Sequence, residues 1–437
     1  MSFDERTLIE QIVRERWYGA KSRDVAHAQI IDSVTLRTTD PQYTLALVEL
    51  RYDTGAHDIY QLLLPDDDAF GVARELVSGM RSGLTLQGAE GIVELRPVAG
   101  FAGLGRELTD ARDVGAEQSN TSVVFDDELI LKVFRRLEAG LNPELEMLRF
   151  LTEHGFSNIA ALGGWYAYSG GPLTATLGIL QQYVRDGLDG WDLALDELAE
   201  EPERFLTRLG RLGEVTGEMH TVLGSEKSDP AFCPESPSVE ALGLLTATVD
   251  EEIARVFLDL PDDAEAVAPI AGRGEEVRDL LRQMTYAGAA GQFIRTHGDY
   301  HLGQTMWSND DWVILDFEGE PARGLAERRR KRSALRDVAG MLRSFAYAAS
   351  AVSLLRDTEP PEDWEERARA RFLEGYLETV DPALLPSGQA AFERLLSVFE
   401  LEKAVYELQY ELDNRPDWVG IPVRGIQRLL EQTSTPA

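Results

Sequence analysis

Two short stretches carry side chains whose types and spacing suit phosphoryl transfer. Residues 296–304 read THGDYHLGQ and place Asp299 five residues before Gln304, and residues 312–321 read WVILDFEGEP, in which an apolar run ends at Asp316. Phosphoryl transfer needs a carboxylate to orient and deprotonate the attacking hydroxyl, and oxygen ligands for Mg²⁺. Asp299 suits the first task, and Gln304 with Asp316 suits the second. The pattern therefore predicts a catalytic carboxylate beside a magnesium site.

The first stretch allows two other interpretations. His297, Asp299 and His301 have the H-x-D-x-H spacing of metal ligands in hydrolases. However, the chain has only six histidines, and the other four form no second ligand cluster in the sequence. An ordinary turn before a strand would also fit, but it leaves the pairing with the second stretch unexplained. We therefore favour the phosphotransfer interpretation.

These stretches, together with residues 333–345, resemble the bacterial maltokinases, a group related to the aminoglycoside phosphotransferases and the eukaryotic-like kinases. The resemblance is carried by HGDYHLGQ, DFEGEP and SALRDVAGMLRSF. The wider relatives usually have Asn five residues after the catalytic Asp, whereas this chain has Gln304, as maltokinases do. RWYGAKSR at residues 16–23 is similar to part of the maltokinase N-terminal cap. The resemblance extends over essentially the whole chain.

The resemblance implies a bilobal protein-kinase-like fold of the α+β class. We expect an N-terminal cap at residues 1–90, a β-rich nucleotide-binding lobe at 91–185, and a mostly α-helical catalytic and sugar-binding lobe at 186–437. Residues 5–20 have the periodicity of an amphipathic helix, and the segments on either side of residues 53–55 alternate like the strands of a hairpin. The length of 437 residues leaves room for two or three domains.

The nucleotide phosphates are expected to meet a loop of small residues and a lysine. In kinase-like folds such a loop lies over the phosphates, and a strand lysine contacts them. Lys132 ends a predicted strand and is one of only five lysines in the chain. The loop is expected at Ser119, Asn120, Thr121 and Ser122. A solvated hairpin is the alternative for this segment.

A helix and a hinge complete the expected ATP site. Asn142 and Pro143 suit the start of a helix, and a carboxylate of that helix is expected to hold Lys132. We choose Glu146 over Glu144, although either side chain could simply favour the helix dipole. The hinge that pairs with adenine is expected in the backbone of Gln182, Tyr183 and Val184.

A predicted helix near the C-terminus carries a polar and aromatic stripe. Its members recur at i, i+3, i+4 and i+7, and so share one helix face: Lys403, Tyr406, Glu407 and Tyr410. Tyrosine rings can stack on the C–H faces of a sugar, and charged groups can bind its hydroxyls. Packing into the core is the alternative, but similarity of residues 406–418 to the maltokinase C-terminus favours sugar binding. We also assign His301 and Glu318 to the sugar site.

The resemblance implies an ATP-dependent kinase, with Mg²⁺ as cofactor, that phosphorylates maltose to maltose 1-phosphate in glycogen, α-glucan and trehalose metabolism. A related kinase for another acceptor such as glucosamine is an alternative, because kinase motifs read only the phosphate side. A catalytically silent partner of a trehalose-forming enzyme is another, although the intact Asp299, Gln304, Asp316 and Lys132 oppose it. A homodimer or an association with trehalose synthase would be compatible with this function.

Composition excludes several classes of partner. A net charge of −33 argues against nucleic acid and anionic membranes, because both would repel the chain. The single cysteine, Cys233, cannot form an intrachain disulfide and fits a reducing cytosol. The sequence shows no secretory signal and no apolar run of about 18 residues, so we expect a cytoplasmic protein without a membrane span. We interpret the basic run at residues 328–332 as a loop paired with neighbouring carboxylates.

Overall fold

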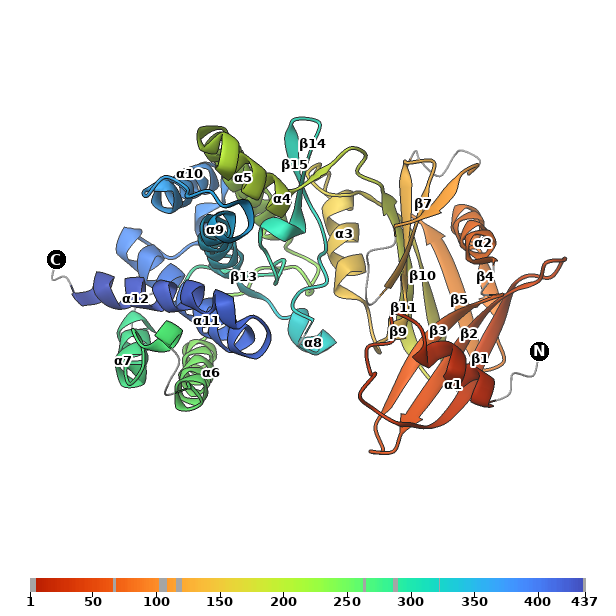
Figure 1. Ribbon diagram of the computed structural model, residues 1–437. Helices are drawn as coiled ribbons and strands as arrows, with labels where there is room; N and C mark the ends of the chain where they lie inside the picture. The colour runs from red at the N-terminus through yellow and green to blue at the C-terminus, as the bar shows by residue number, and fades with distance from the viewer. Residues whose placement is uncertain are drawn as a thin grey trace. The chain divides into compact units, whose positions relative to one another are not determined.

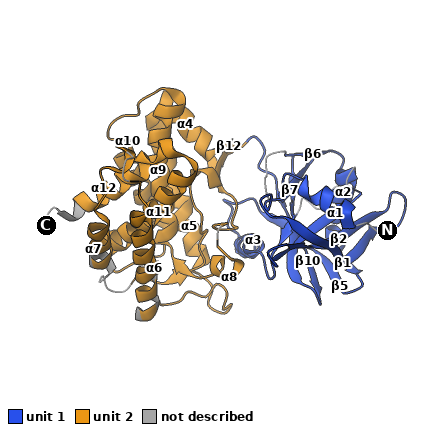
Figure 2. Cartoon of the chain, turned by 60° about the horizontal axis from the view of Figure 1, so that its bottom comes forward, with its two compact units in different colours: residues 1–186 blue, residues 187–437 orange. Residues whose placement is uncertain are grey.

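The computed structural model describes residues 5–65, 68–101, 108–114, 120–261, 265–285, 290–321 and 323–434. Contacts divide the chain into two compact units, Met1–Asp186 and Gly187–Ala437 (Figures 1 and 2). Strands dominate the first unit and helices the second, so the mixed α+β class is confirmed. The expected cap and nucleotide lobe fall together in the first unit, and the boundary near residue 90 stays a prediction.

One antiparallel sheet of the first unit has the strand order β1, β2, β3, β9. These strands are β1 (Val25–Arg37), β2 (Tyr43–Tyr52), β3 (His57–Leu64) and β9 (Arg136–Leu137). The predicted hairpin is confirmed, since β2 and β3 pair from Thr44 opposite Leu64 to Arg51 opposite His57. Alternate β2 side chains such as Val48 and Leu50 are buried in an apolar core against α1 (Glu5–Val13).

The predicted helix at residues 5–20 is too long, because α1 ends at Val13. Trp17 and Tyr18 lie beyond its end, and their rings pack on Tyr60 with centroid distances of 5.7 and 5.8 Å. Burying two large aromatic side chains against the sheet outweighs the gain from about two more helical turns. This contact attaches the RWYG segment to the first sheet.

The second sheet of this unit has seven strands in the order β4, β5, β10, β11, β8, β7, β6. Their bounds are β4 (Thr85–Gln87), β5 (Gly91–Pro97), β10 (Leu162–Gly170), β11 (Thr174–Gln182), β8 (Leu129–Phe134), β7 (Asn120–Phe125) and β6 (Ala111–Asp113). Besides α1, the described part of this unit contains the helices α2 (Ala69–Ser82) and α3 (Pro143–Glu153). As predicted, α3 begins after Asn142, whose side chain accepts hydrogen bonds from Glu144 N and Leu145 N.

The second unit is built mainly from helices. The long ones are α4 (Gly190–Glu200), α5 (Pro202–Leu223), α6 (Val239–Leu258), α7 (Gly274–Thr285), α9 (Leu335–Arg356), α10 (Trp364–Thr379), α11 (Gln389–Asn414) and α12 (Gly420–Ser434). Short elements are β12 (Leu188–Asp189), β13 (Phe293–Ile294), β14 (Thr305–Ser308), β15 (Asp311–Ile314), β16 (Arg332–Ser333), α8 (Leu325–Arg328) and the 3₁₀ turns η3 (Glu265–Val267), η4 (Leu302–Gln304), η5 (Pro382–Leu384) and η6 (Pro416–Trp418). The strands form two small antiparallel sheets, β12-β14-β15 and β13-β16.

The helices pack against one another in two regions of this unit. An apolar core joins α6, α7, α11 and α12, which lie side by side in Figure 1. On another side, glycines let α5 and α10 approach closely, because a Cβ at Gly213 would lie 2.0 Å from the carbonyl oxygen of Phe372. The central helix α9 contacts α4, α10, α11 and α12, so the start of α9 is held from several directions.

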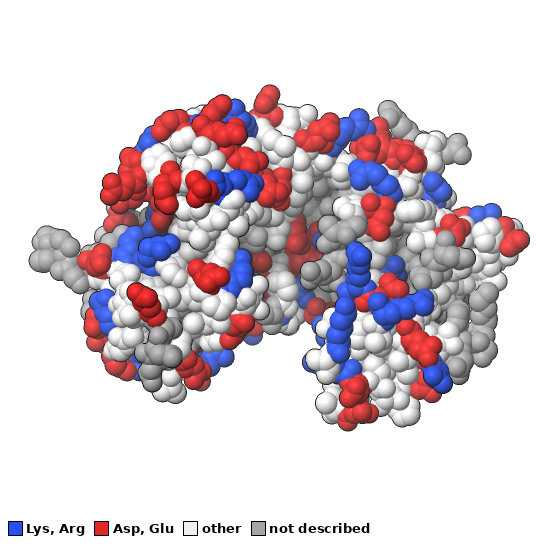
Figure 3. Space-filling model, viewed as in Figure 1, with Lys and Arg blue, Asp and Glu red and all other residues white. Residues whose placement is uncertain are grey.

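Helix α9 is long and apolar enough to cross a membrane by length and composition alone, but 67% of its most apolar 18-residue window is buried within the protein. The apolarity of α9 is therefore that of a core helix. Acidic side chains instead gather on the surface, where Figure 3 shows them crowded over α5 and α10. This distribution agrees with the strongly negative composition of the chain.

Candidate active site

Asp337, in the first turn of α9, holds the loop that carries Asp299. Its Oδ2 accepts a hydrogen bond from His297 N at 2.7 Å, and its Oδ1 accepts one from Gly298 N at 2.9 Å. His220 Nε2 lies 3.2 Å from Oδ2. Burial alone would raise the pKa of Asp337, but the hydrogen bond and charge of His220 lower that pKa below its ordinary value. The side chain is therefore a carboxylate that ties the loop to α9.

Three further contacts fix the same loop. His297 Nε2 lies 2.8 Å from Leu315 O, and the hydroxyls of Tyr300 and Thr216 lie 2.9 Å apart. In α9, a Cβ at Gly340 would lie 2.6 Å from Tyr300 O, so only glycine allows the loop to pack so closely on the helix. These contacts therefore fix the backbone both before and after Asp299.

Asp299 lies beside a lysine from a distant part of the chain. Lys403 Nζ, on α11, is 3.4 Å from Asp299 Oδ1 and 5.2 Å from the centre of the Tyr406 ring. Burial by itself would lower the pKa of Lys403, but the charges of Asp299, Glu407 and Glu320 raise it above its ordinary value. Lys403 is therefore an ammonium at neutral pH, and it faces a carboxylate suited to act as a base.

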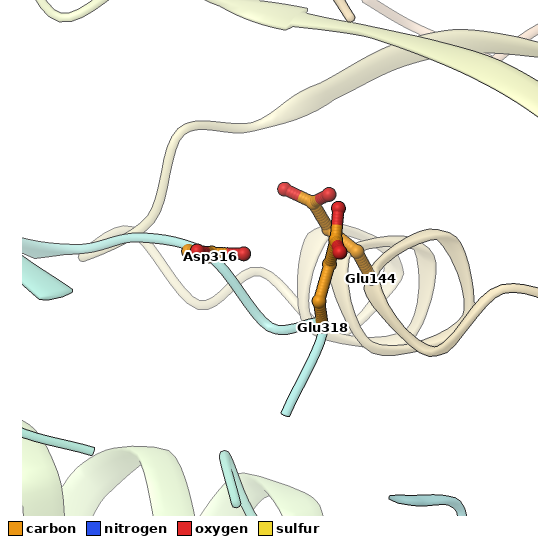
Figure 4. A group of neighbouring side chains, drawn as sticks. All are labelled: Glu144, Asp316 and Glu318. Atoms are coloured by element: carbon orange, nitrogen blue, oxygen red, sulfur yellow. The ribbon is translucent and has the colours of Figure 1, made fainter. Parts of the chain in front are cut away.

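The structure brings Gln304 and Asp316 together. Gln304 Nε2 donates a hydrogen bond to Asp316 Oδ2 at 3.3 Å, and Leu315 N donates to Gln304 O at 2.9 Å. Asp316 has φ 56, a left-handed conformation that is uncommon for a residue other than glycine. Asp316 and Glu318 lie on the loop that follows β15 (Figure 4). The amide oxygen of Gln304 and the carboxylate of Asp316 are the hard oxygen ligands that suit Mg²⁺, so the residues present fit such an ion.

A pocket opens at Asp299 within the second unit. It contains about 500 Å³ of open space, including the part open to solvent. Its walls are mostly charged or polar and come from five segments: Glu252 on α6, residues 298–300 of the loop, Glu320 and Arg323, Arg336 to Gly340 on α9, and Phe399 to Tyr406 on α11. A pocket of this size and polarity at a candidate base is suited to a small polar acceptor.

Sequence reasoning missed five of these wall residues, namely Glu252, Glu320, Arg323, Arg336 and Glu402. Glu402 Oε1 forms an ion pair with the Arg336 guanidinium at 2.8 Å, and Arg323 pairs with Glu320. Glu320 lies inside the DFEGEP stretch, and Glu402 is next to Lys403. Their closeness in sequence to predicted site residues could have identified these two. Glu252 lies on a helix that carries no recognised motif.

The four stripe residues of α11 do not share one environment, so that expectation needs correction. Lys403 and Tyr406 line the pocket, but Glu407 is buried and its Oε2 accepts from Arg343 at 2.7 and 2.9 Å. Tyr410 is 43% exposed, and the Arg415 guanidinium lies 5.4 Å from its ring centre. An ion pair with α9 outweighs solvation for Glu407, because an unpaired buried arginine would be costly. Glu407 and Tyr410 therefore do not line this pocket, and their binding to a sugar stays a prediction.

His301 caps the 3₁₀ turn η4, where its Nδ1 accepts a hydrogen bond from Gly303 N at 3.1 Å. Burial lowers the pKa of His301 below its ordinary value, although the Asp299 charge opposes this. A neutral imidazole is required for Nδ1 to accept. Its sugar-binding role, like that of Glu318, stays a prediction.

In the first unit, Lys132 pairs with a carboxylate of α3, as expected of a kinase-like lysine. Lys132 Nζ lies 3.0 Å from Glu144 Oε2, the residue that the sequence analysis ranked second. Both glutamates are buried in the first turns of the helix (Figure 4 shows Glu144 on α3). The choice of Glu146 as the carboxylate that holds Lys132 stays a prediction.

The small residues expected over the phosphates are partly in a strand. Ser119 lies outside the described residues, and Asn120, Thr121 and Ser122 begin β7 rather than forming a loop. Ser122 is buried opposite Lys132 in the sheet register, and the Thr121 hydroxyl accepts from Arg135 Nε at 2.8 Å. Strand pairing with β8 satisfies their backbone, which is why the polar composition misled the prediction.

The expected hinge follows β11, and most of its N–H groups are already used. Gln182 N donates to Ala161 O at 2.9 Å, and Tyr183 N donates to Glu128 O at 2.8 Å. Adenine binding by this segment stays a prediction, in which the N–H of Val184 would be the donor, since the described residues show backbone partners for the other two.

Comparison with known proteins shows which protein families two regions of the chain match. Residues 110–319 match the family model described as the phosphotransferase enzyme family, and residues 12–80 match the maltokinase N-terminal cap domain. The chain therefore combines a maltokinase N-terminal cap domain with a phosphotransferase-family region, each over the residues matched. Both matched ranges agree with the placement of the catalytic stretch and the RWYG segment, so the predicted family is confirmed.

Curated relatives and solved structures give the same fold. The chain is 27% identical over 339 residues to a glucosamine kinase of Streptacidiphilus jiangxiensis, covering 74% of each protein, and 25% identical over 342 residues to one of Mycolicibacterium smegmatis, covering 74% of this chain and 81% of the relative. A solved glucosamine kinase aligns with a TM-score of 0.75 at 20% identity, over 98% of this chain and 100% of that one. The kinase-like fold with an N-terminal cap is therefore shown.

Proposed function

We propose that this protein is an ATP-dependent sugar kinase that phosphorylates maltose to maltose 1-phosphate. The observation that carries the proposal is the position of Asp299, which lines a polar pocket, lies 3.4 Å from the Lys403 ammonium, and sits on a loop held by Asp337. A carboxylate fixed in this way can receive a proton from a bound hydroxyl. The similarity of residues 406–418 to the maltokinase C-terminus supports maltose as the acceptor.

The proposed reaction assigns one task to each group. Asp299 orients the anomeric hydroxyl and takes its proton as the oxygen attacks the γ-phosphorus of ATP. A new P–O bond forms to the sugar, the bond to the β-phosphate oxygen breaks, and ADP leaves. Lys132, held by Glu144, would contact the ATP phosphates, and Val184 N–H would bind adenine.

Gln304 and Asp316 would hold Mg²⁺. The ion, when bound, neutralises phosphate charge and helps to orient the nucleotide. The left-handed backbone of Asp316 and its hydrogen bond from Gln304 fix these two side chains next to each other without the ion. Such preorganisation reduces the conformational cost of binding the metal–nucleotide complex.

Glucosamine is a second candidate acceptor. The curated relatives named above are glucosamine kinases, and one solved relative is a complex with glucosamine, ADP and inorganic phosphate. The pocket also holds carboxylates at Glu252, Glu320 and Glu402, which could bind an ammonium group. The overall identity of 27% does not extend the relatives' specificity to this chain.

A panel of maltose, glucosamine and glucose, each with ATP and Mg²⁺ and monitored by ADP release, tests the proposal. We expect the highest kcat/KM with maltose and a product that carries phosphate at the anomeric carbon, detected by ³¹P NMR. A clear preference for glucosamine would replace the acceptor but keep the kinase. Failure to turn over any sugar would overturn the kinase proposal and favour a catalytically silent partner of a trehalose-forming enzyme.

The physiological setting follows from the same proposal. Maltose 1-phosphate would supply α-glucan synthesis, and we propose that the protein works in the cytoplasm. A homodimer or an association with trehalose synthase stays a prediction, which size measurement of the purified protein with and without that enzyme would test.

A further inference from the structure

Glu402 is a buried carboxylate in the pocket of the second unit. It is 8% exposed on α11 and lines the pocket together with Asp299 and Lys403. Its Oε1 forms an ion pair with Arg336 at 2.8 Å, and the Arg323 guanidinium lies 3.9 Å from the same oxygen. One side of the carboxylate is thus held in place by two guanidinium groups.

The other carboxylate oxygen, Oε2, is buried and has no hydrogen-bond partner within the part of the chain that the structure describes. A buried polar atom without a partner costs about 1–3 kcal/mol, more when it is charged. Proteins seldom keep such an atom in a well-packed region, and where they do it commonly serves a ligand or a bound water. The position of Glu402 in the pocket wall favours a ligand.

A second carboxylate in the pocket also favours a ligand that carries a hydrogen-bond donor. Glu252 of α6 lines the same pocket. Burial raises the pKa of Glu252, and the negative charge of Glu402 raises it further. These two acidic side chains oppose each other electrostatically, so a hydroxyl or ammonium placed between them would relieve the repulsion. Lys403 is engaged with Asp299 and does not supply this donor.

We propose that Glu402 is a specificity-determining residue of the acceptor site and that its Oε2 accepts a hydrogen bond from a hydroxyl or ammonium group of the acceptor sugar. The inference rests on the proposed kinase function and deepens it. A site with a buried hydrogen-bond acceptor discriminates strongly against a sugar that lacks the matching donor. The carboxylate oxygen is left without a hydrogen bond when such a sugar binds. Glu402 would thereby select the acceptor, while Asp299 performs the proton transfer.

The test compares three variants in steady-state kinetics with the best acceptor of the panel. Glu402→Gln keeps the shape but removes the charge, and we expect the KM for the sugar to rise at least about tenfold with the KM for ATP unchanged. Arg336→Gln breaks the same ion pair but leaves Oε2 in place, and a smaller rise is expected. Glu393→Gln, an exposed position on the same helix, serves as the matched control.

The outcomes separate the inference from the proposed function. An unchanged sugar KM in Glu402→Gln, or a rise no larger than that of Arg336→Gln, overturns the role of Glu402 while the kinase stands. No turnover by the wild-type protein overturns both. Binding of the sugar to each variant by calorimetry gives a readout independent of turnover, and the melting temperature of each variant shows that it is folded. A larger loss for glucosamine than for maltose identifies the donor as ammonium, and equal losses identify it as hydroxyl.

Discussion

At the scale of single residues, one buried carboxylate organises the catalytic loop. Asp337 binds two consecutive backbone N–H groups, of His297 and Gly298, and is backed by His220, itself 3.1 Å from the Tyr376 hydroxyl. Asp337, His297 and His220 are buried, so their hydrogen bonds replace bonds to water and satisfy polar groups that the solvent does not reach. The geometry of Asp299 therefore depends on a residue 38 positions later in the sequence.

Replacing Asp337 by Asn should destabilise the protein at neutral pH by about 3 kcal/mol, because the hydrogen bonds that its charged carboxylate accepts from His297 N and Gly298 N are weakened or lost. The pKa of Asp337 is lowered in the folded state. Its contribution is therefore fully present above the ordinary aspartate pKa near pH 4 and is lost as pH falls through the lower, folded value. Urea denaturation of wild type and variant between pH 3 and 7 measures this.

The variant's deficit should be constant from pH 5 to 7 and shrink as the solution becomes more acidic than about pH 4. A deficit that stays the same down to pH 3 would contradict the ionised role of Asp337. Asp413→Asn, on the exposed part of α11, provides the control for the loss of a carboxylate.

The ion pair of Lys132 leads to a second residue-scale test. Since Glu144 Oε2 lies 3.0 Å from Lys132 Nζ, Glu144→Gln should weaken ATP binding about tenfold or more by releasing Lys132. Glu146→Gln, a matched change two residues further along the same helix, should have a smaller effect on ATP affinity. Fluorescence titration with a labelled ATP analogue would measure both. Equal losses of affinity would argue that the helix dipole, rather than the ion pair, is what matters.

At the scale of elements, the contiguous motifs were predictable and the contacts between distant helices were not. Asp299, Gln304 and Asp316 lie within 18 residues, and the local order of turn and strand brings Gln304 and Asp316 together. The pairing of Lys403 with Asp299 and of Arg343 with Glu407 depends on how α11 crosses α9, which no local pattern encodes. The stripe prediction failed for that reason, because helical periodicity defines a face without defining its neighbour.

The approach of the catalytic loop to α9 gives a test at this scale. Gly340→Ala would place a methyl group 2.6 Å from Tyr300 O, too close for any Cβ contact, so the loop must move. We expect kcat to fall at least about tenfold, since misplacing a catalytic group by about 1 Å is costly. Gly243→Ala, on α6 with nothing within 4 Å, is the matched control and should behave as wild type. Wild-type kinetics in Gly340→Ala would show that the loop position is not restrained by the helix.

At the scale of the whole molecule, composition and fold class were accessible from sequence, and the arrangement inside each unit was not. Alternation in residues 43–64 was enough to predict the β2–β3 hairpin. The joining of β9 to β3, and of β4 and β5 to the nucleotide strands, pairs segments far apart in the chain, for which the sequence carries only general β propensity. The net charge of −33 indicated which partners the protein would repel. It did not predict that Arg323, Arg336 and Lys403 gather around the pocket.

The central claim is that Asp299 is the base of a kinase, and replacing it by Asn tests this most directly. Asn keeps the size and a hydrogen-bonding oxygen but cannot take the proton, so kcat with the preferred sugar should fall by about 10²-fold or more. The Kd for ATP, measured by calorimetry on the same preparations, should stay within about twofold of wild type. Turnover close to wild type in Asp299→Asn, with ATP binding intact, would contradict the account.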